Sequence, residues 1–323
     1  MRRSLQTVVA LACSSFFACK SSTKTHSPPE STAQIRTNEP AIELPDASSG
    51  DADTPAGDAD APAFTSAQKL TIATREWTFP SGRRAVVLVP DTRGPLPLVI
   101  ALHGRGEALK GKDRGAWGWP RDYDLLHALD RVQAPPLTNR DFLGFVTDPH
   151  LAKRNRELAD HRYGPVVVAC PYLPDVKLEG TTELDAYASF VVDELLPRLK
   201  KETSIDESRI GIDGVSLGGA VALYVGFKYA REFSRVGAIQ GAIQQADTPT
   251  WLERAVRARS MQPALSVRIL TSDEDYFRDG NRSLAKALEG AAFKSEFIEL
   301  PGPHDYPFNR GPGSYELLFF HAR

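Results

Sequence analysis

Apolar and polar residues alternate in blocks along the chain from about residue 67 onward. Nearly continuous apolar runs are typical of strands buried on both faces, whereas apolar residues spaced three and four apart are typical of helices. The runs predict strands at residues 75–80, 83–90, 97–102, 164–171, 208–215, 235–242, 266–272 and 294–302. The spacing predicts helices at residues 183–201, 216–230, 281–292 and 313–322.

This order of elements predicts an α/β fold. Strands that alternate with helices form βαβ units, so we expect a mostly parallel central sheet with helices on both faces. In such a sheet the loops at the carboxyl ends of the strands bind ligands. Residues 104–163, after the third predicted strand, form an unusually long connection, which we expect to be a functional insertion or a lid.

The first 66 residues have a different character. Residues 1–19 open with two arginines, continue through a short apolar stretch and end at a cysteine, which is the layout of an export signal. Phe16–Cys19 resembles a bacterial lipobox, so we expect Cys19 to carry a lipid anchor, with Cys13 as the second candidate. A plain cleaved signal or a short anchor is the alternative. Residues 20–66, rich in Ser, Thr, Pro, Ala and Asp, predict a disordered tether ahead of a domain at 67–323.

We therefore expect export to the bacterial cell envelope, with the domain anchored through Cys19 or otherwise periplasmic or secreted. The whole chain has 323 residues, 41% of them apolar, and a formal net charge of −2. A surface built for nucleic acid or anionic lipid carries a strong basic excess. Nucleic acid is therefore not an expected partner, and contact with a membrane is expected only through the lipid anchor.

The most specific short motif is "GVSLGG" at residues 214–219. Its first five residues fit G-x-S-x-G and lie between a predicted strand and a predicted helix, where that motif forms a sharp turn that exposes the serine. The amide of Leu217, at the start of the helix, is expected to face developing negative charge. Ser216 is therefore a candidate nucleophile.

A nucleophilic serine needs a base and an orienting carboxylate. His304, in "LPGPHDY", lies in the loop directly after the last predicted strand and is the candidate base. The loop after the strand at 266–272 offers three candidate acids, of which we favour Asp275, then Asp273, then Asp279. The acyl-transfer chemistry of such a triad implies no metal and no cofactor.

The segment "HGRGEALKGKD" at 103–113 permits a second interpretation, because residues 106–112 have the glycine-lysine spacing of a phosphate-binding loop. That loop requires Ser or Thr after its lysine, where this chain has Asp113, and its glycines follow the strand directly, whereas His103-Gly104-Arg105 intervenes here. We therefore reject nucleotide binding. Lys110 and Lys112 are then solvated charges or contacts for an anionic substrate.

Taken together, residues 67–323 resemble serine esterases of the α/β-hydrolase fold, in the branch that includes esterase D. The resemblance rests on "LHGRG", "GVSLGG", "TSDEDYFRDGNRSL" and "LPGPHDYPF". It implies the chain order Ser216, Asp275, His304 for the triad. It also implies a second oxyanion-hole amide at Arg105, with Gly104 nearby.

The leading hypothesis is a serine hydrolase that cleaves carboxylic esters of a small molecule, a glycan or a lipid through an acyl-enzyme on Ser216. Peptide cleavage or acyl transfer by the same triad is an alternative, and a non-catalytic surface-binding lipoprotein is another. The long connection carries the aromatic residues Trp117, Trp119 and Tyr123, which are expected either to line the substrate pocket or to pack the loop against the domain.

Overall fold

An eight-stranded sheet of order β1-β2-β4-β3-β5-β6-β7-β8 runs through residues 70–322, the part of the chain that the computed structural model describes. The strands are β1 (Ile72–Thr78), β2 (Arg84–Pro90), β3 (Leu96–Leu102), β4 (Val167–Pro171), β5 (Ile205–Gly214), β6 (Arg235–Ile239), β7 (Ser266–Glu274) and β8 (Ser295–Pro303). β1 and β2 form an antiparallel hairpin, β2 pairs antiparallel with β4, and the remaining neighbours are parallel. The predicted α/β architecture is thus confirmed.

The strands at the centre of the sheet are the ones that read as continuous apolar runs. Every residue of β3 and β4 is buried, with Val99 opposite Val168 on one side and Gly211 on the other. Because helices cover both faces of the sheet, the side chains on both sides of these strands are buried, and polar residues do not alternate with apolar ones. Cys170 is buried within β4, and burial raises the pKa of its thiol.

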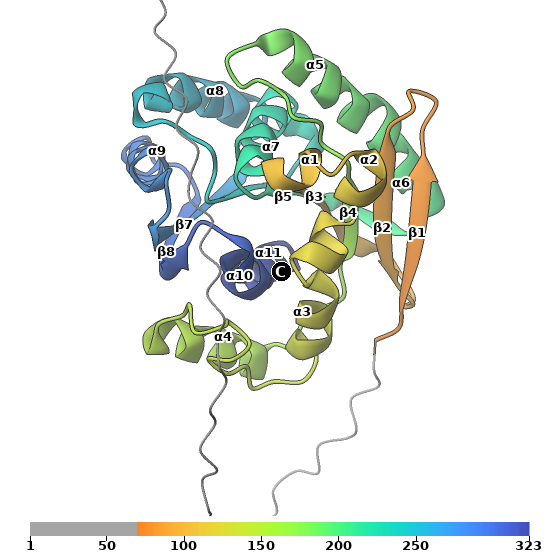
Figure 1. Ribbon diagram of the computed structural model, residues 1–323, viewed down its shortest axis with the longest axis vertical. Helices are drawn as coiled ribbons and strands as arrows, with labels where there is room; N and C mark the ends of the chain where they lie inside the picture. Colours follow the sequence, from red (N-terminus) through yellow and green to blue (C-terminus); the bar gives the residue numbers. More distant parts are fainter. Residues whose placement is uncertain (1–69, 323) are drawn as a thin grey trace, which may run out of the picture. The chain divides into compact units, whose positions relative to one another are not determined.

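Two sets of helices cover the sheet. The helices and helical turns are α1 (Arg105–Ala108), α2 (Lys112–Gly115), η1 (Gly118–Asp122), α3 (Leu125–Val132), α4 (Asp148–Asp160), α5 (Thr181–Ser189), η2 (Phe190–Leu195), α6 (Leu196–Glu202), α7 (Leu217–Lys228), η3 (Ala230–Glu232), η4 (Gln245–Asp247), α8 (Thr248–Met261), α9 (Arg278–Gly290), α10 (Tyr306–Phe308), η5 (Asn309–Gly313) and α11 (Ser314–His321). Figure 1 shows α7 and α8 on one side of the sheet and α3, α4 and α11 on the other. Each set packs its own apolar cluster against the strands.

The long connection between β3 and β4 is part of the domain's core. It supplies α1 to α4, and its buried Trp119, Leu129 and Phe142 belong to the same apolar cluster as Tyr315 and Leu318 of α11. Phe142 and Tyr315 stack with ring centroids 4.9 Å apart. The connection is long because it builds one covering layer of the sheet.

The predictions for the export signal, the tether and Cys19 concern residues outside the described range. Within residues 70–322, no helix has the length and apolarity that a membrane span requires.

A buried ion pair joins the long connection to the last helix. Arg154 of α4 donates two hydrogen bonds to Glu316 of α11, one of them from Nε at 2.9 Å, and both side chains are almost fully buried. His150 Nε2 lies 2.7 Å from the same carboxylate. Burial alone would raise the pKa of Glu316, but the charge of Arg154 and these hydrogen bonds offset it and hold the pKa at about 2.

We predict that Glu316 makes stability depend on acid pH. Its pKa in the folded state lies below the usual value of 4.5, so its stabilising contribution is complete above pH 4.5 and is lost as the pH falls towards 2. At about 1.4 kcal/mol per pKa unit the contribution is about 3 kcal/mol. Urea unfolding at pH 7, 4 and 3 should show this loss in the wild type and a flatter profile in Glu316→Gln.

The control is Glu253→Gln, which removes the exposed ion pair between Glu253 and Arg257 on α8. Exposed pairs of this kind contribute little, so its pH profile should match the wild type. A Glu316→Gln profile as steep as the wild type would contradict the prediction.

Candidate active site

Ser216 lies in a strained turn between β5 and α7. Its φ of 57° and ψ of −117° are unfavourable for any residue with a side chain. Backbone hydrogen bonds hold the turn on both sides: Val215 N–H donates to Leu102 at 3.1 Å and Ser216 N–H donates to Ile239 at 2.9 Å. The sheet therefore fixes the serine at the carboxyl ends of β3, β5 and β6.

The glycines of "GVSLGG" are required by space. A Cβ at Gly214 would lie 2.4 Å from the carbonyl oxygen of Gly218, and a Cβ at Gly218 would lie 2.5 Å from the carbonyl oxygens of Leu102 and His103. Backbone atoms cannot move aside as a flexible side chain can. The motif predicted from sequence thus has the local structure that G-x-S-x-G requires.

Three residues far apart in sequence form a hydrogen-bonded relay. Ser216 Oγ lies 3.0 Å from His304 Nε2, and His304 Nδ1 lies 2.6 Å from Asp275 Oδ1. Ser216 follows β5, Asp275 follows β7 and His304 follows β8, so the carboxyl ends of parallel strands bring them together. The His304 side chain is 13% exposed, and that of Asp275 is fully buried.

The carboxylate of Asp275 is fixed by several donors besides the histidine. Thr271 Oγ1 donates to Oδ2 at 2.6 Å, and the amide of Phe277 donates to Oδ1 at 2.9 Å. Asn281 Nδ2 adds a longer bond of 3.4 Å to Oδ2. Sequence reasoning did not assign these roles to Thr271 and Asn281.

The other two candidate acids do other things. Asp273 Oδ1 accepts a hydrogen bond of 2.8 Å from the amide of Gly302, which fastens the loop that carries His304. Asp279 lies in the first turn of α9. Of the three, Asp275 is the one that the structure brings to His304.

Two of the three predicted oxyanion-hole residues begin helices. Leu217 is the first residue of α7 and Arg105 is the first residue of α1, and amides in a first helical turn have no acceptor within their own helix. Gly104 differs, because its amide donates to the hydroxyl of Tyr123 at 3.0 Å. This amide hydrogen is therefore already bonded within the protein. The prediction that Gly104 contributes to the oxyanion hole is wrong in this respect.

His103, which precedes these residues, has a structural role. Burial lowers the pKa of its imidazole, which stays neutral. Nδ1 donates to the carbonyl of Gly104 at 2.9 Å, and Nε2 accepts from the amide of Leu173 at 2.9 Å. The ring thus ties the loop after β3 to the loop after β4.

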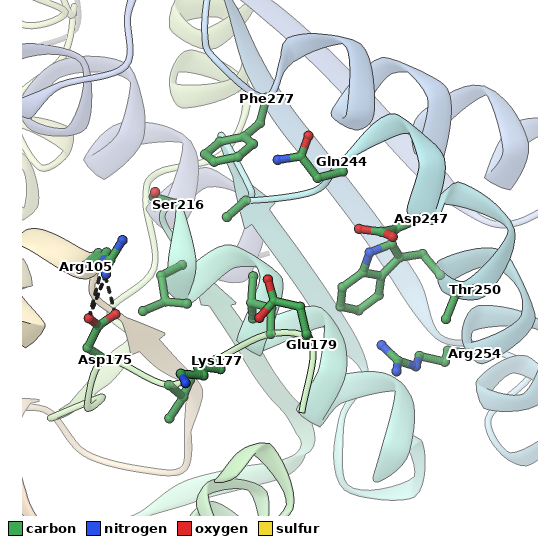
Figure 2. Close-up of a pocket in the computed structure, with 15 residues that line it drawn as sticks. Arg105, Asp175, Lys177, Glu179, Ser216, Gln244, Asp247, Thr250, Arg254 and Phe277 are labelled. Atoms are coloured by element: carbon green, nitrogen blue, oxygen red, sulfur yellow. Dashed lines mark hydrogen bonds and ion pairs between the residues drawn. The ribbon is translucent and has the colours of Figure 1, made fainter. Parts of the chain in front are cut away.

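A cavity of about 770 Å³ opens beside Ser216. Leu217, Trp251 and Phe277 give it apolar walls, and Figure 2 shows Ser216 at one side of it and α8 at the other. Its charged lining residues are Arg105, Asp175, Lys177, Glu179, Asp247 and Arg254. Arg105 pairs with Asp175, with Nε 2.9 Å from the carboxylate. Because the lining residues include as many cations as anions, the charges around the cavity balance.

The prediction that Trp117 and Trp119 line the pocket is wrong. Trp119 is fully buried in the core cluster and packs edge to face against Tyr123, with ring centroids 5.1 Å apart. Trp117 packs against the same cluster, and the guanidinium of Arg121 lies 3.6 Å from its ring centroid. The alternative, packing of the loop against the domain, is what these indoles and the buried Tyr123 do.

The cavity's own tryptophan, Trp251, was missed because α8 was missed. The buried face of α8 carries Trp251, Ala255 and Ala258. Because two of these residues are alanines, the apolar spacing that predicts a helix is weak in this part of the sequence. The long connection contributes only Arg105 to the cavity lining, so the expected lid is not found there. Lys110 pairs with Asp122 at 2.9 Å and does not line the cavity either.

Comparison with known proteins points to one class. Residues 171–304 match the model of the family described as "Putative esterase". A comparison with curated proteins found no significant match. The matched segment includes Ser216, Asp275 and His304.

Solved structures share the fold. A ferulic acid esterase aligns with a TM-score of 0.58 at 18% identity, covering 79% of this chain and 99% of its own. An S-formylglutathione hydrolase from Staphylococcus aureus aligns with a TM-score of 0.51 at 12% identity, covering 79% and 100%. One from Agrobacterium tumefaciens has a TM-score of 0.51 at 16% identity, covering 80% and 96%.

The chain has the α/β-hydrolase fold, as the sheet order and these neighbours show. Together with the match of residues 171–304 to the esterase family model, this fold supports a carboxylic ester hydrolase.

We predict that Gly218→Ala damages the turn at Ser216. Its Cβ would collide with the carbonyl oxygens of Leu102 and His103, and overpacking of this kind costs about 1–3 kcal/mol. Thermal unfolding should show a lower Tm. Gly290→Ala is the matched control, since a Cβ there meets nothing within 4 Å and alanine suits the end of α9. Equal Tm values for the two variants would contradict the prediction.

Proposed function

We propose that this protein is a serine esterase that hydrolyses carboxylic esters through an acyl-enzyme on Ser216. The observation that carries the proposal is the relay from Ser216 Oγ through His304 to Asp275, at 3.0 and 2.6 Å, at the edge of the cavity. A serine without such a base is a weak nucleophile.

In the first step Ser216 Oγ attacks the ester carbonyl, and its proton moves to His304 Nε2. The carbonyl oxygen takes up the negative charge, and the amides of Leu217 and Arg105 donate to it. The carboxylate of Asp275, held by Thr271 and Phe277, keeps the proton of His304 on Nδ1 and stabilises the imidazolium.

In the second step the bond to the alcohol breaks, and His304 returns its proton to the departing oxygen. Water then attacks the acyl-enzyme, gives its proton to His304 and releases the acid, while Ser216 recovers its hydroxyl. Cations and anions balance around the cavity, so we propose a substrate without strong net charge whose polar groups these side chains bind.

Substitutions in the relay test this proposal. Ser216→Ala should reduce hydrolysis of short p-nitrophenyl esters to background and abolish labelling by a fluorophosphonate probe. Asp275→Asn should lower kcat by about 10⁴-fold, because an amide cannot hold His304 in the required tautomer.

The matched control is Asp273→Asn, whose amide oxygen can still accept from Gly302 and which should keep kcat within about twofold. Full activity in Ser216→Ala would overturn the proposed function. A large loss in Asp273→Asn with none in Asp275→Asn would overturn the choice of acid.

We also propose, from the sequence of residues 1–66, that the domain is displayed at the cell envelope through a lipid on Cys19. In cells expressing the full chain, the wild type should partition into Triton X-114, and Cys19→Ser should shift to the aqueous phase. Cys13→Ser is the control and should partition as the wild type does. Identical partitioning of Cys19→Ser and wild type would contradict the anchor.

A further inference from the structure

Glu107 is a buried carboxylate that the proposed mechanism does not use. It lies in α1, two residues after Arg105, and its side chain is 2% exposed. The surroundings leave no spare room: a Cβ at Gly118 would lie 2.7 Å from Glu107 Cγ, and one at Gly115 would lie 2.5 Å from its carbonyl oxygen. The absence of side chains at Gly115 and Gly118 thus leaves the room that Glu107 occupies.

One oxygen of Glu107 connects to the loop of the proposed oxyanion hole. Tyr123 donates its hydroxyl hydrogen to Oε2, and the same hydroxyl oxygen accepts the amide of Gly104 at 3.0 Å. Burial and the charge of Glu107 raise the pKa of Tyr123, so the phenol keeps the proton that it donates. Gly104 directly precedes Arg105, whose amide is a proposed oxyanion donor.

The other oxygen connects to the loop of the proposed base. Tyr306 donates its hydroxyl hydrogen to Oε1 at 2.6 Å, and Lys110 Nζ lies 3.4 Å from the same oxygen. Tyr306 follows His304 by two residues and begins α10. Burial and the hydrogen bond to Glu107 raise the pKa of Tyr306, so this phenol also stays a donor.

We propose that Glu107 is a positioning residue for the esterase reaction, in which a single carboxylate holds the Arg105 loop through Tyr123 and the His304 loop through Tyr306. The proposal rests on the proposed function. A buried carboxylate is costly, and an ionised one accepts from two hydroxyls at once without offering a donor of its own.

A glutamine at this position would break that arrangement. Its single oxygen can serve one tyrosine, and its NH₂ group then faces the other. Tyr123 Oη already accepts the amide of Gly104, so a second donor directed at it would compete with that bond. One of the two hydroxyls therefore loses its acceptor on this side chain, and the loop that it holds is fastened less firmly.

The test compares Glu107→Gln with the wild type on p-nitrophenyl esters. A misplacement of about 1 Å can cost about 100-fold in rate, so we expect kcat to fall about 10- to 100-fold with KM within about twofold. The rate of fluorophosphonate labelling at Ser216 should fall in parallel. Tyr123→Phe and Tyr306→Phe, which remove one hydroxyl each, should give smaller losses of kcat.

Combining the variants separates positioning from packing. The effects of substitutions within one hydrogen-bond network are not additive. Tyr306→Phe should therefore lower kcat by a smaller factor in the Glu107→Gln background than in the wild type. Glu316→Gln is the matched control, because it also converts a buried carboxylate to an amide but contacts neither loop. It should lower stability and leave kcat unchanged at a temperature where circular dichroism shows it folded.

The outcomes are distinct. The proposal is overturned if the wild type hydrolyses esters while the folded Glu107 and tyrosine variants keep kcat within about twofold. It is also overturned if Glu107→Gln loses activity only in proportion to its unfolded fraction. If Glu107→Gln does not fold, the two tyrosine variants decide by the same criterion. A wild type that neither hydrolyses esters nor reacts with the probe would refute the proposed function itself, and Glu107 with it.

Discussion

The backbone conformation of Ser216 is the constraint on which the site depends. A positive φ at a residue with a side chain costs on the order of 1–3 kcal/mol, and it persists only where the surroundings determine it fully. Here hydrogen bonds to Leu102 and Ile239 pull the turn against two neighbouring strands, and glycines allow the backbone of α7 to come close. The strained conformation persists because the sheet that holds the turn is continuous and buried. The serine is therefore held at the end of the sheet in one orientation.

Buried charges support this turn from below. Asp213, three residues before Ser216, is fully buried and accepts the amide of Gly214 at 2.8 Å. The same carboxylate accepts from Arg268 of β7 and lies 2.9 Å from His321 Nε2 of α11. Burial tends to raise the pKa of Asp213, but the charge of Arg268 and its hydrogen bonds lower it, so the group stays ionised. One carboxylate thereby joins β5, β7 and α11 three residues before Ser216.

The sequence predicts the parts of this molecule whose signal is local. Continuous apolar runs predict the buried strands, and G-x-S-x-G predicts the sharp turn at Ser216, because both depend on neighbours along the chain. Asp275 could be favoured over Asp273 but not separated from it, since only the fold shows which carboxylate reaches His304 and which reaches Gly302. Trp119 was misjudged because burial is a property of the packed sheet. His321, near the end of the sequence and without a motif, gave no signal of its contact with Asp213.

The place of α11 in the core has a consequence for how the chain acquires its structure. Helix α11 packs against β3, β5 and β6, and its Tyr315 and Leu318 complete the apolar cluster that α3 begins. During synthesis from the amino end, β3 and α3 emerge long before α11, so one apolar face of the nascent sheet stays incompletely covered until α11 is made. Uncovered faces of this kind are the surfaces through which partly made chains aggregate or are held by chaperones. Ser216 and the residues that hold its turn, Leu102 and Ile239, are therefore all translated before the helix that completes this side of the core.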